Sequence, residues 1–214
     1  MRQATRLGVS IMLLLTIMCS QNLFAQKAKD VFNADTPLTY LGIDFSNARI
    51  IGETSNQAWE IRDKFFASIN GVVVNEPKKY DMQKTFQKGY VNFNLDPVMS
   101  VNSKAPLEGL MTMNSSDDSR INNKVIADMA REYKLDGKKG VGLVIIMETM
   151  NKIQNRASMH FTFVDLASGK VLFTEKVSGK PKGFGFRNFW AGAVHDALQQ
   201  VQKQHYMVWK NNNS

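Results

Sequence analysis

Residues 141–177 read VGLVIIMETMNKIQNRASMHFTFVDLASGKVLFTEKV, and this stretch decides the fold. It contains three runs rich in β-branched, aromatic and other apolar residues, at positions 141–150, 157–166 and 171–177. Such runs, bounded by polar and glycine-containing segments, are typical of β-strands. The last two runs are separated by Ala167-Ser168-Gly169, a connection typical of a β-hairpin. The stretch therefore predicts three strands in succession.

Further strands and helices are predicted on both sides of this stretch. Residues 40–46 and 91–95 alternate apolar and polar side chains, which is typical of half-buried strands. Apolar residues recur at helical spacing after residue 54, after residue 119 and across residues 187–209. Strands and helices in this order predict a sheet on which helices pack.

The fold class that follows is α/β (α+β), with a single mixed sheet of about five to six strands and about three helices packed on it. We expect Asn70-Gly71 to end the first helix, which leaves residues 72–74 as a short buried strand. Residues 98–118, rich in serine and asparagine, form the longest expected loop.

The N-terminus carries the pattern of a secretory signal peptide. Arg2 and Arg6 precede a twelve-residue apolar run at positions 7–18, which is shorter than the roughly 20 residues of a membrane-spanning helix. A polar patch then leads to Ala25, after which we expect cleavage. Cys19 suggests an alternative, in which a lipoprotein signal anchors the chain through a lipid, but Met18 before it is not the small residue that such a signal requires.

These observations divide the chain into a signal peptide (1–25), a flexible lead-in (26–37), a single α/β domain (38–209) and a frayed tail (210–214). We expect the protein to be exported, and either periplasmic or secreted. No second apolar run reaches the length that a membrane-spanning helix needs.

The net charge and the cysteine content limit the partners and the chemistry that we expect of the protein. The formal net charge is +8, of which the leader contributes two positive charges, and this basic excess favours acidic partners. Cys19 is the single cysteine, so cleavage after Ala25 would leave a mature chain without disulfides, thiol catalysis or thiolate metal ligands.

The layout resembles a known class of envelope proteins. A strand containing Ile43-Asp44-Phe45-Ser46 precedes a helix, and a later helix leads into residues 141–148. A strand ending at Asp165 and turning through Gly169-Lys170 follows, and a helix closes the chain. Across residues 38–208 this order is similar to the periplasmic α/β accessory modules of bacterial envelopes, which include the TolB amino-terminal domain and the CsgG/LpoB-type lipoproteins. The resemblance implies a fold and does not by itself imply an activity.

Residues 182–189 (KGFGFRNF) combine basic residues, glycines and aromatic side chains. RNA-recognition domains use a similar pattern to stack bases, but they place it on a central strand, whereas here it follows a hairpin and opens a helix. We therefore expect no nucleic acid partner, and we expect the glycines to shape a loop whose aromatic residues anchor the last helix. The cations near this helix N-terminus could instead hold an anion. The candidate anion- or partner-binding residues are Lys176, Lys180, Lys182, Phe184 and Arg187.

No catalytic, cofactor or metal motif stands out. His160, His195 and His205 lack the spacing of metal ligands, and no nucleotide-binding glycine loop is present, so we expect no cofactor and no metal. Asp44, Glu148 and Asp165 could all lie at strand ends, where they would act as acid and base if two of them shared a cleft.

Three functions remain open. The first is an exported envelope protein that binds a protein partner or an acidic polymer and has no catalytic site. The second is a small hydrolase built on the dispersed carboxylates, and the third is a binder of anions or lipid headgroups that uses the basic segment 176–187.

Overall fold

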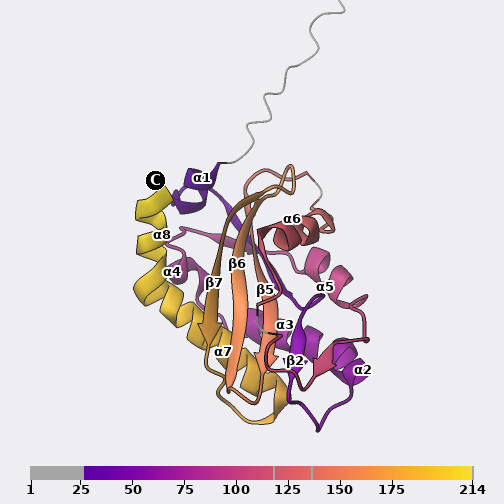
Figure 1. The fold of residues 1–214 in the computed structure, drawn as a ribbon. Helices are drawn as coiled ribbons and strands as arrows, with labels where there is room; N and C mark the ends of the chain where they lie inside the picture. The colour runs from indigo at the N-terminus through magenta and orange to yellow at the C-terminus, as the bar shows by residue number, and fades with distance from the viewer. Residues whose placement is uncertain (1–26, 118, 136, 214) are drawn as a thin grey trace, which may run out of the picture.

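The structure is a computed structural model that describes residues 27–117, 119–135 and 137–213. Its centre is an antiparallel meander of β5 (Val141–Asn151), β6 (Arg156–Asp165) and β7 (Val171–Gly179). These are the three strands predicted from residues 141–177 (Figure 1). Every residue of β5 is buried, because strands or helices cover both its edges and both its faces.

The other edge of β5 pairs with two short strands, one after the other. β1 (Leu38–Asp44) runs parallel to the first half of β5, and β2 (Arg49–Ile51) runs parallel to its end. β3 (Val91–Phe93) adds to β1, and β4 (Met111–Thr112) adds to β2, which gives a mixed sheet of seven strands in the described part of the chain. The predicted mixed α/β sheet is confirmed. The strands that the sequence pattern does not predict are β2 and β4, which are too short to show alternation.

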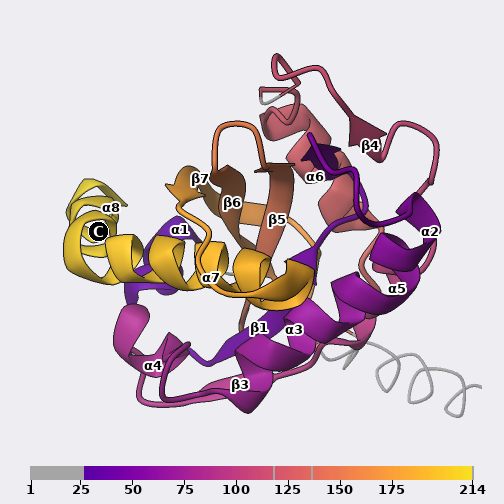
Figure 2. The same ribbon diagram turned by 90° about the horizontal axis from the view of Figure 1, so that it is seen from below.

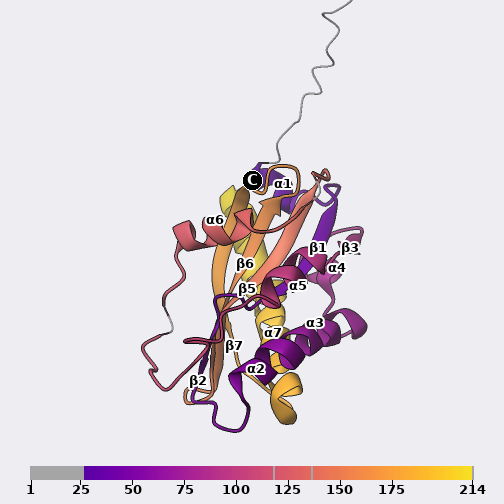
Figure 3. The ribbon, with the colours of Figure 1, turned by 90° about the vertical axis from the view of Figure 1, so that its right-hand side faces the viewer.

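Helices cover both faces of the sheet. α3 (Phe66–Asn75) and α7 (Gly185–Gln200) pack with the larger core on one face, and α5 (Asp96–Asn102) and α6 (Asn123–Arg131) pack with a smaller core on the other. Figures 2 and 3 show α7 and α6 on opposite sides of the central strands. The alternation along β5 separates the two cores, since Leu143 and Ile145 face the first core while Val144 and Ile146 face the second.

Two long helices each contain a wider turn. α2 (Ala58–Glu60), a π-helical turn (Ile61–Phe65) and α3 form one continuous run, and α7, a second π-helical turn (Val201–His205) and α8 (Tyr206–Asn213) form another. A further short helix, α4 (Met82–Thr85), lies between α3 and β3.

The predicted stop at Asn70-Gly71 is wrong, and residues 72–74 are not a strand, because α3 continues through them to Asn75. Asn70 is buried. Its side-chain oxygen accepts the N–H of Ile43 (2.7 Å), and its side-chain NH₂ group donates to the carbonyl oxygen of Ile43 (3.0 Å). The sequence Asn-Gly usually ends a helix, but here the Asn70 side chain connects α3 to β1 and the helix continues. The expected loop 98–118 is also partly wrong, since α5 opens with Pro97 in its first turn, a position that suits proline.

Helices lie within the expected lead-in and extend into the expected tail. α1 (Ala28–Phe32) buries Val31 and Phe32, whose ring meets that of Phe173 at 5.3 Å between centroids. The carbonyl oxygens just after α1 accept hydrogen bonds from the Nζ of Lys88. At the other end, α8 continues past residue 209 because Trp209 is itself buried and keeps the last turns against the core.

The predicted signal peptide, including Cys19, lies outside the described residues. Among the residues that are described, none of the helices has the length and apolar character needed to cross a membrane.

Candidate functional site

Three segments meet at the end of the molecule opposite α1 and the end of α8 (Figure 1). They are residues 52–59 after β2, residues 152–156 in the β5–β6 hairpin, and residues 180–189 between β7 and α7; we call this end the tip. Glu53 and Lys152 form an ion pair across it at 3.2 Å. Together with Phe184, Phe186 and other residues they line a hollow of about 400 Å³.

Two glycines fix the position of the segment 180–189. A Cβ atom on Gly179 would lie 2.0 Å from the carbonyl oxygen of Ala193, and one on Gly192 would lie 2.0 Å from the carbonyl oxygen of Lys182. Any other residue at these positions would collide with backbone, so glycine lets α7 lie directly against β7 and the loop that follows it. The N–H of Lys182 also donates to the carbonyl oxygen of Phe189 at 3.2 Å, which folds the loop back on the helix.

The aromatic residues of this segment have two different environments. Phe186 meets Phe65 at 4.7 Å, and both Phe186 and Phe189 pack against the larger core, so they anchor the first turns of α7 as predicted from the sequence. Phe184 precedes α7 in an extended conformation, between two glycines with positive φ, and its side chain is 94% exposed. Phe184 is the one phenylalanine of this segment among the candidate binding residues predicted from the sequence.

The facing loop is held by Glu53. One carboxylate oxygen accepts the N–H groups of Ser55 (2.6 Å) and Asn56 (3.2 Å), and the other faces the Nζ of Lys152. Burial by itself would raise the pKa of Glu53, but the hydrogen bond from Ser55 and the ion pair with Lys152 hold that pKa below its usual value. Glu53 is therefore a charged structural anchor, with a side chain only 3% exposed.

Four of the five predicted binding residues belong to the tip. Phe184 and Arg187 border a second, wider hollow together with Lys64, and Lys180 and Lys182 are exposed on the segment that leads to them. The structure does not place Lys176 with this group.

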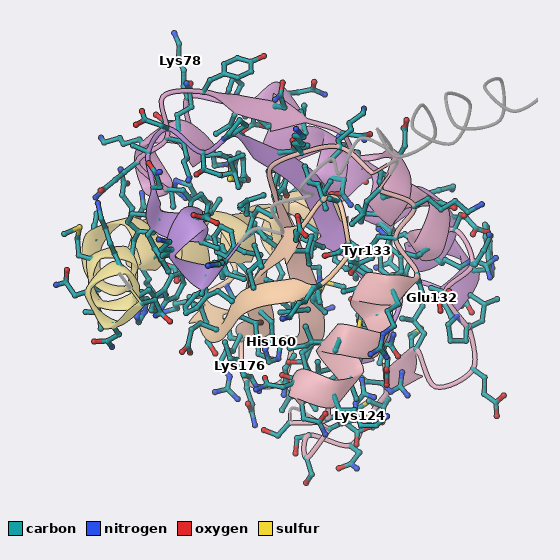
Figure 4. The ribbon with its side chains drawn as sticks, turned by 90° about the horizontal axis from the view of Figure 1, so that it is seen from above. Lys78, Lys124, Glu132, Tyr133, His160 and Lys176 are labelled. Atoms are coloured by element: carbon teal, nitrogen blue, oxygen red, sulfur yellow. The ribbon has the colours of Figure 1, made fainter. Side chains whose placement is uncertain are left out.

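Lys176 points to the opposite face of the sheet, the one that carries α6 (Figure 4). Its Nζ lies 2.6 Å from Oε2 of Glu148, and Nε2 of His160 lies 3.3 Å from the same oxygen. The other oxygen of Glu148 accepts the backbone N–H groups of Arg120 (2.6 Å) and Ile121 (2.8 Å). Burial by itself would raise the pKa of Glu148, but these partners lower it to about 2. The carboxylate thus fastens the segment before α6 to the sheet.

The three candidate carboxylates do not share one cleft. Asp44 is buried beside α6, where it accepts the hydroxyl of Tyr133 at 2.5 Å, and burial raises its pKa. It borders a hollow of about 270 Å³ that Glu148 does not line. Asp165 accepts the Ser168 hydroxyl (2.5 Å) at the β6–β7 turn, so it forms a turn. The arrangement that a two-carboxylate hydrolase would need is not formed.

The remaining histidines pack against aromatic rings. His195 lies edge-on to Tyr80 at 5.7 Å, and burial is the main cause that lowers its pKa. His205 stacks on Trp209 at 5.8 Å. Within the described ranges, no three histidine, cysteine or acidic side chains are grouped so that they could hold a metal ion.

Comparison with known proteins gives likenesses of fold. No family model matches the chain, and no curated protein matches it. The C-terminal domain of LpoB from Salmonella enterica is similar at 12% identity and a TM-score of 0.31, covering 69% of this chain and 84% of that domain. The hypothetical protein CT253 from Chlamydia trachomatis is similar at 10% identity and a TM-score of 0.33, covering 82% of this chain and 96% of that one. An LpoB domain is thus among the similar structures, as the sequence resemblance predicts, and the likeness identifies neither a ligand nor a partner.

Proposed function

We propose that this chain is an exported protein of the bacterial envelope that acts as a binding or accessory component, without a catalytic site of its own. The N-terminal pattern of two arginines, an apolar run and Ala25 supports export. The tip is the surface through which the protein attaches to an envelope component.

The observation that carries this proposal is the exposure of Phe184. A phenylalanine ring that is 94% in water is unfavourable by about 2 kcal/mol relative to a buried one. The fold nevertheless places this residue at two surface hollows, which it lines together with Lys152 in one and with Lys64 and Arg187 in the other. A partner that covers the ring would remove this cost.

Two measurements test the proposal. Mass spectrometry of the protein from fractionated cells should find a chain that begins after Ala25 in the envelope or periplasmic fraction, and intact Met1 in the cytosol would contradict export. Purified protein should cosediment with isolated envelopes, and Phe184→Ser should weaken that attachment about tenfold, by loss of the apolar contact.

The matched control is Tyr90→Ser, which removes an equally aromatic side chain that is 68% exposed near the start of β3, away from the tip. Its envelope attachment should equal that of the unchanged protein. Equal attachment of the Phe184→Ser variant would show that the tip is not the binding surface.

A further inference from the structure

We infer that the envelope component bound by the tip is an anionic lipid bilayer, with the Phe184 ring inserted between the lipids and Lys182 and Arg187 placed among the phosphate groups. The inference rests on the proposed function, since it names the partner of the same surface.

The first support is the geometry of Phe184. Phe184 is exposed on a loop that the Lys182–Phe189 hydrogen bond and the close approach of Gly192 and Gly183 to neighbouring backbone tie to α7. Insertion therefore requires little further ordering of the chain, so most of the free energy of burying the ring is available for binding.

The second support is the charge of the surrounding segments. Residues 152–156 and 180–188 contain five basic residues and no acidic one. On the third segment the side chain of Glu53 is withdrawn from solvent and paired with Lys152. The acids that follow it are also paired, Glu60 with Lys64 at 3.1 Å and Asp63 with Arg62 at 2.6 Å. The tip thus presents net positive charge, which complements an anionic leaflet.

The third support is the way in which the apolar side chains are distributed. Trp59 (51% exposed), Ile153 (57%) and Phe184 stand on three separate segments, with polar and basic residues between them. A protein interface places its aromatic residues in one packed centre. A fluid bilayer accepts separate side chains without shape complementarity, and tryptophan beside a lysine suits the headgroup level. The tip has such a pair, because the Nζ of Lys64 lies over the Trp59 ring, 5.7 Å from its centroid.

The first experiment measures sedimentation of the purified protein with vesicles of phosphatidylethanolamine and phosphatidylglycerol in equal parts, and with vesicles of phosphatidylcholine alone. Binding should require the anionic lipid. Phe184→Ser should lower the partition coefficient about tenfold. Charge reversal of both Lys182 and Arg187 should lower it at least as much, because each cation near an anionic surface contributes about fivefold. Tyr90→Ser should leave it unchanged.

The second experiment uses Trp59 as a reporter. The chain has three tryptophans, and Trp190 and Trp209 are buried, so a change of emission on vesicle binding reports Trp59. We expect a blue shift and quenching by brominated lipids. Because Phe184 and Ile153 are exposed, Phe184→Ser and Ile153→Ser should unfold at the same urea concentration as the unchanged protein, so a loss of binding is a loss of contact.

Each outcome distinguishes the inference from the proposed function. Attachment to envelopes without binding to protein-free vesicles overturns the lipid partner and leaves the attachment surface intact. Failure to bind either envelopes or vesicles overturns both. Vesicle binding that survives Phe184→Ser also overturns the insertion, since another surface would then bind the lipid. Vesicle binding that inorganic phosphate abolishes at unchanged ionic strength overturns it as well, since the tip would then bind only a free anion.

Discussion

Replacing Glu148 with glutamine should reveal how strongly this carboxylate fastens the segment before α6 to the sheet. One of its oxygens accepts the backbone N–H groups of Arg120 and Ile121, and the other faces the side chains of Lys176 and His160. The amide of Glu148→Gln can accept from the backbone with its oxygen. Its NH₂ group must then face the Nζ of Lys176, which is itself a donor and lies only 2.6 Å from the present oxygen.

The magnitude follows from the pKa. The partners of Glu148 lower its pKa from the ordinary 4.5 to about 2 despite burial, a difference that corresponds to about 3 kcal/mol of stability. Because the folded pKa is lowered, this contribution is fully present above about pH 5 and is lost as the pH falls toward 2. About 2 of the 3 kcal/mol should be gone by about pH 3.

Urea unfolding, followed by tryptophan fluorescence, provides the assay. At neutral pH Glu148→Gln should lower the free energy of unfolding by about 3 kcal/mol, and the difference from the unchanged protein should shrink steadily in acid. Glu175→Gln is the control, because Glu175 lies on the same strand as Lys176 and is exposed; it should change stability by less than about 0.5 kcal/mol. A difference for Glu148→Gln that is just as small at neutral pH, or one that stays constant down to about pH 3, would refute the reasoning.

Two further predictions concern close packing and burial. Gly192→Ala should lower the unfolding free energy by about 3 kcal/mol, because its Cβ would lie 2.0 Å from a backbone carbonyl oxygen. Gly71→Ala, in an open position within α3, should instead raise it by about 0.5–1 kcal/mol; equal effects in thermal melts would contradict the packing argument. Burial lowers the pKa of Lys88 to about 8, so the unfolded chain binds its proton more tightly than the folded one. The stability of the unchanged protein, measured relative to Lys88→Met, should therefore rise between about pH 8 and about pH 10, and a flat difference would count against the buried amine.

The fold could be predicted where side-chain pattern and structure have the same cause. The runs at residues 141–177 form strands because they bury apolar side chains on both faces of a sheet, and burial is what a pattern records. The prediction failed where a polar side chain has a distant partner. Asn70 ends no helix because its amide bonds to Ile43, which is 27 positions away and cannot be identified from local sequence.

In the candidate site, too, local pattern predicts some of the positions and distant partners determine the others. Alternation along the strands places Glu148, His160 and Lys176 on one face, and register makes His160 and Lys176 neighbours. The backbone donors that complete the group come from residues 120 and 121, just before α6, and their helical spacing does not indicate which side chain accepts from them. Closeness in sequence groups Lys176 with the basic loop, but the period of two along β7 places its side chain on the face of the sheet that carries α6.

The period of two along β7 also explains how the tip is attached closely to α7 and still exposes Phe184. Gly179 lies on the face of β7 that meets α7, and with Gly192 it lets the helix lie directly against the backbone of β7 and of the connecting segment. Phe186 and Phe189, which are partly buried, complete the attachment by packing against the core, while the single residue between the loop glycines is exposed. Stability and presentation therefore depend on the same contacts. A variant that loosens them, such as Gly192→Ala, should weaken vesicle binding even though it leaves Phe184 and every cation of the tip unchanged, because the ring would then have to be ordered at the moment of insertion.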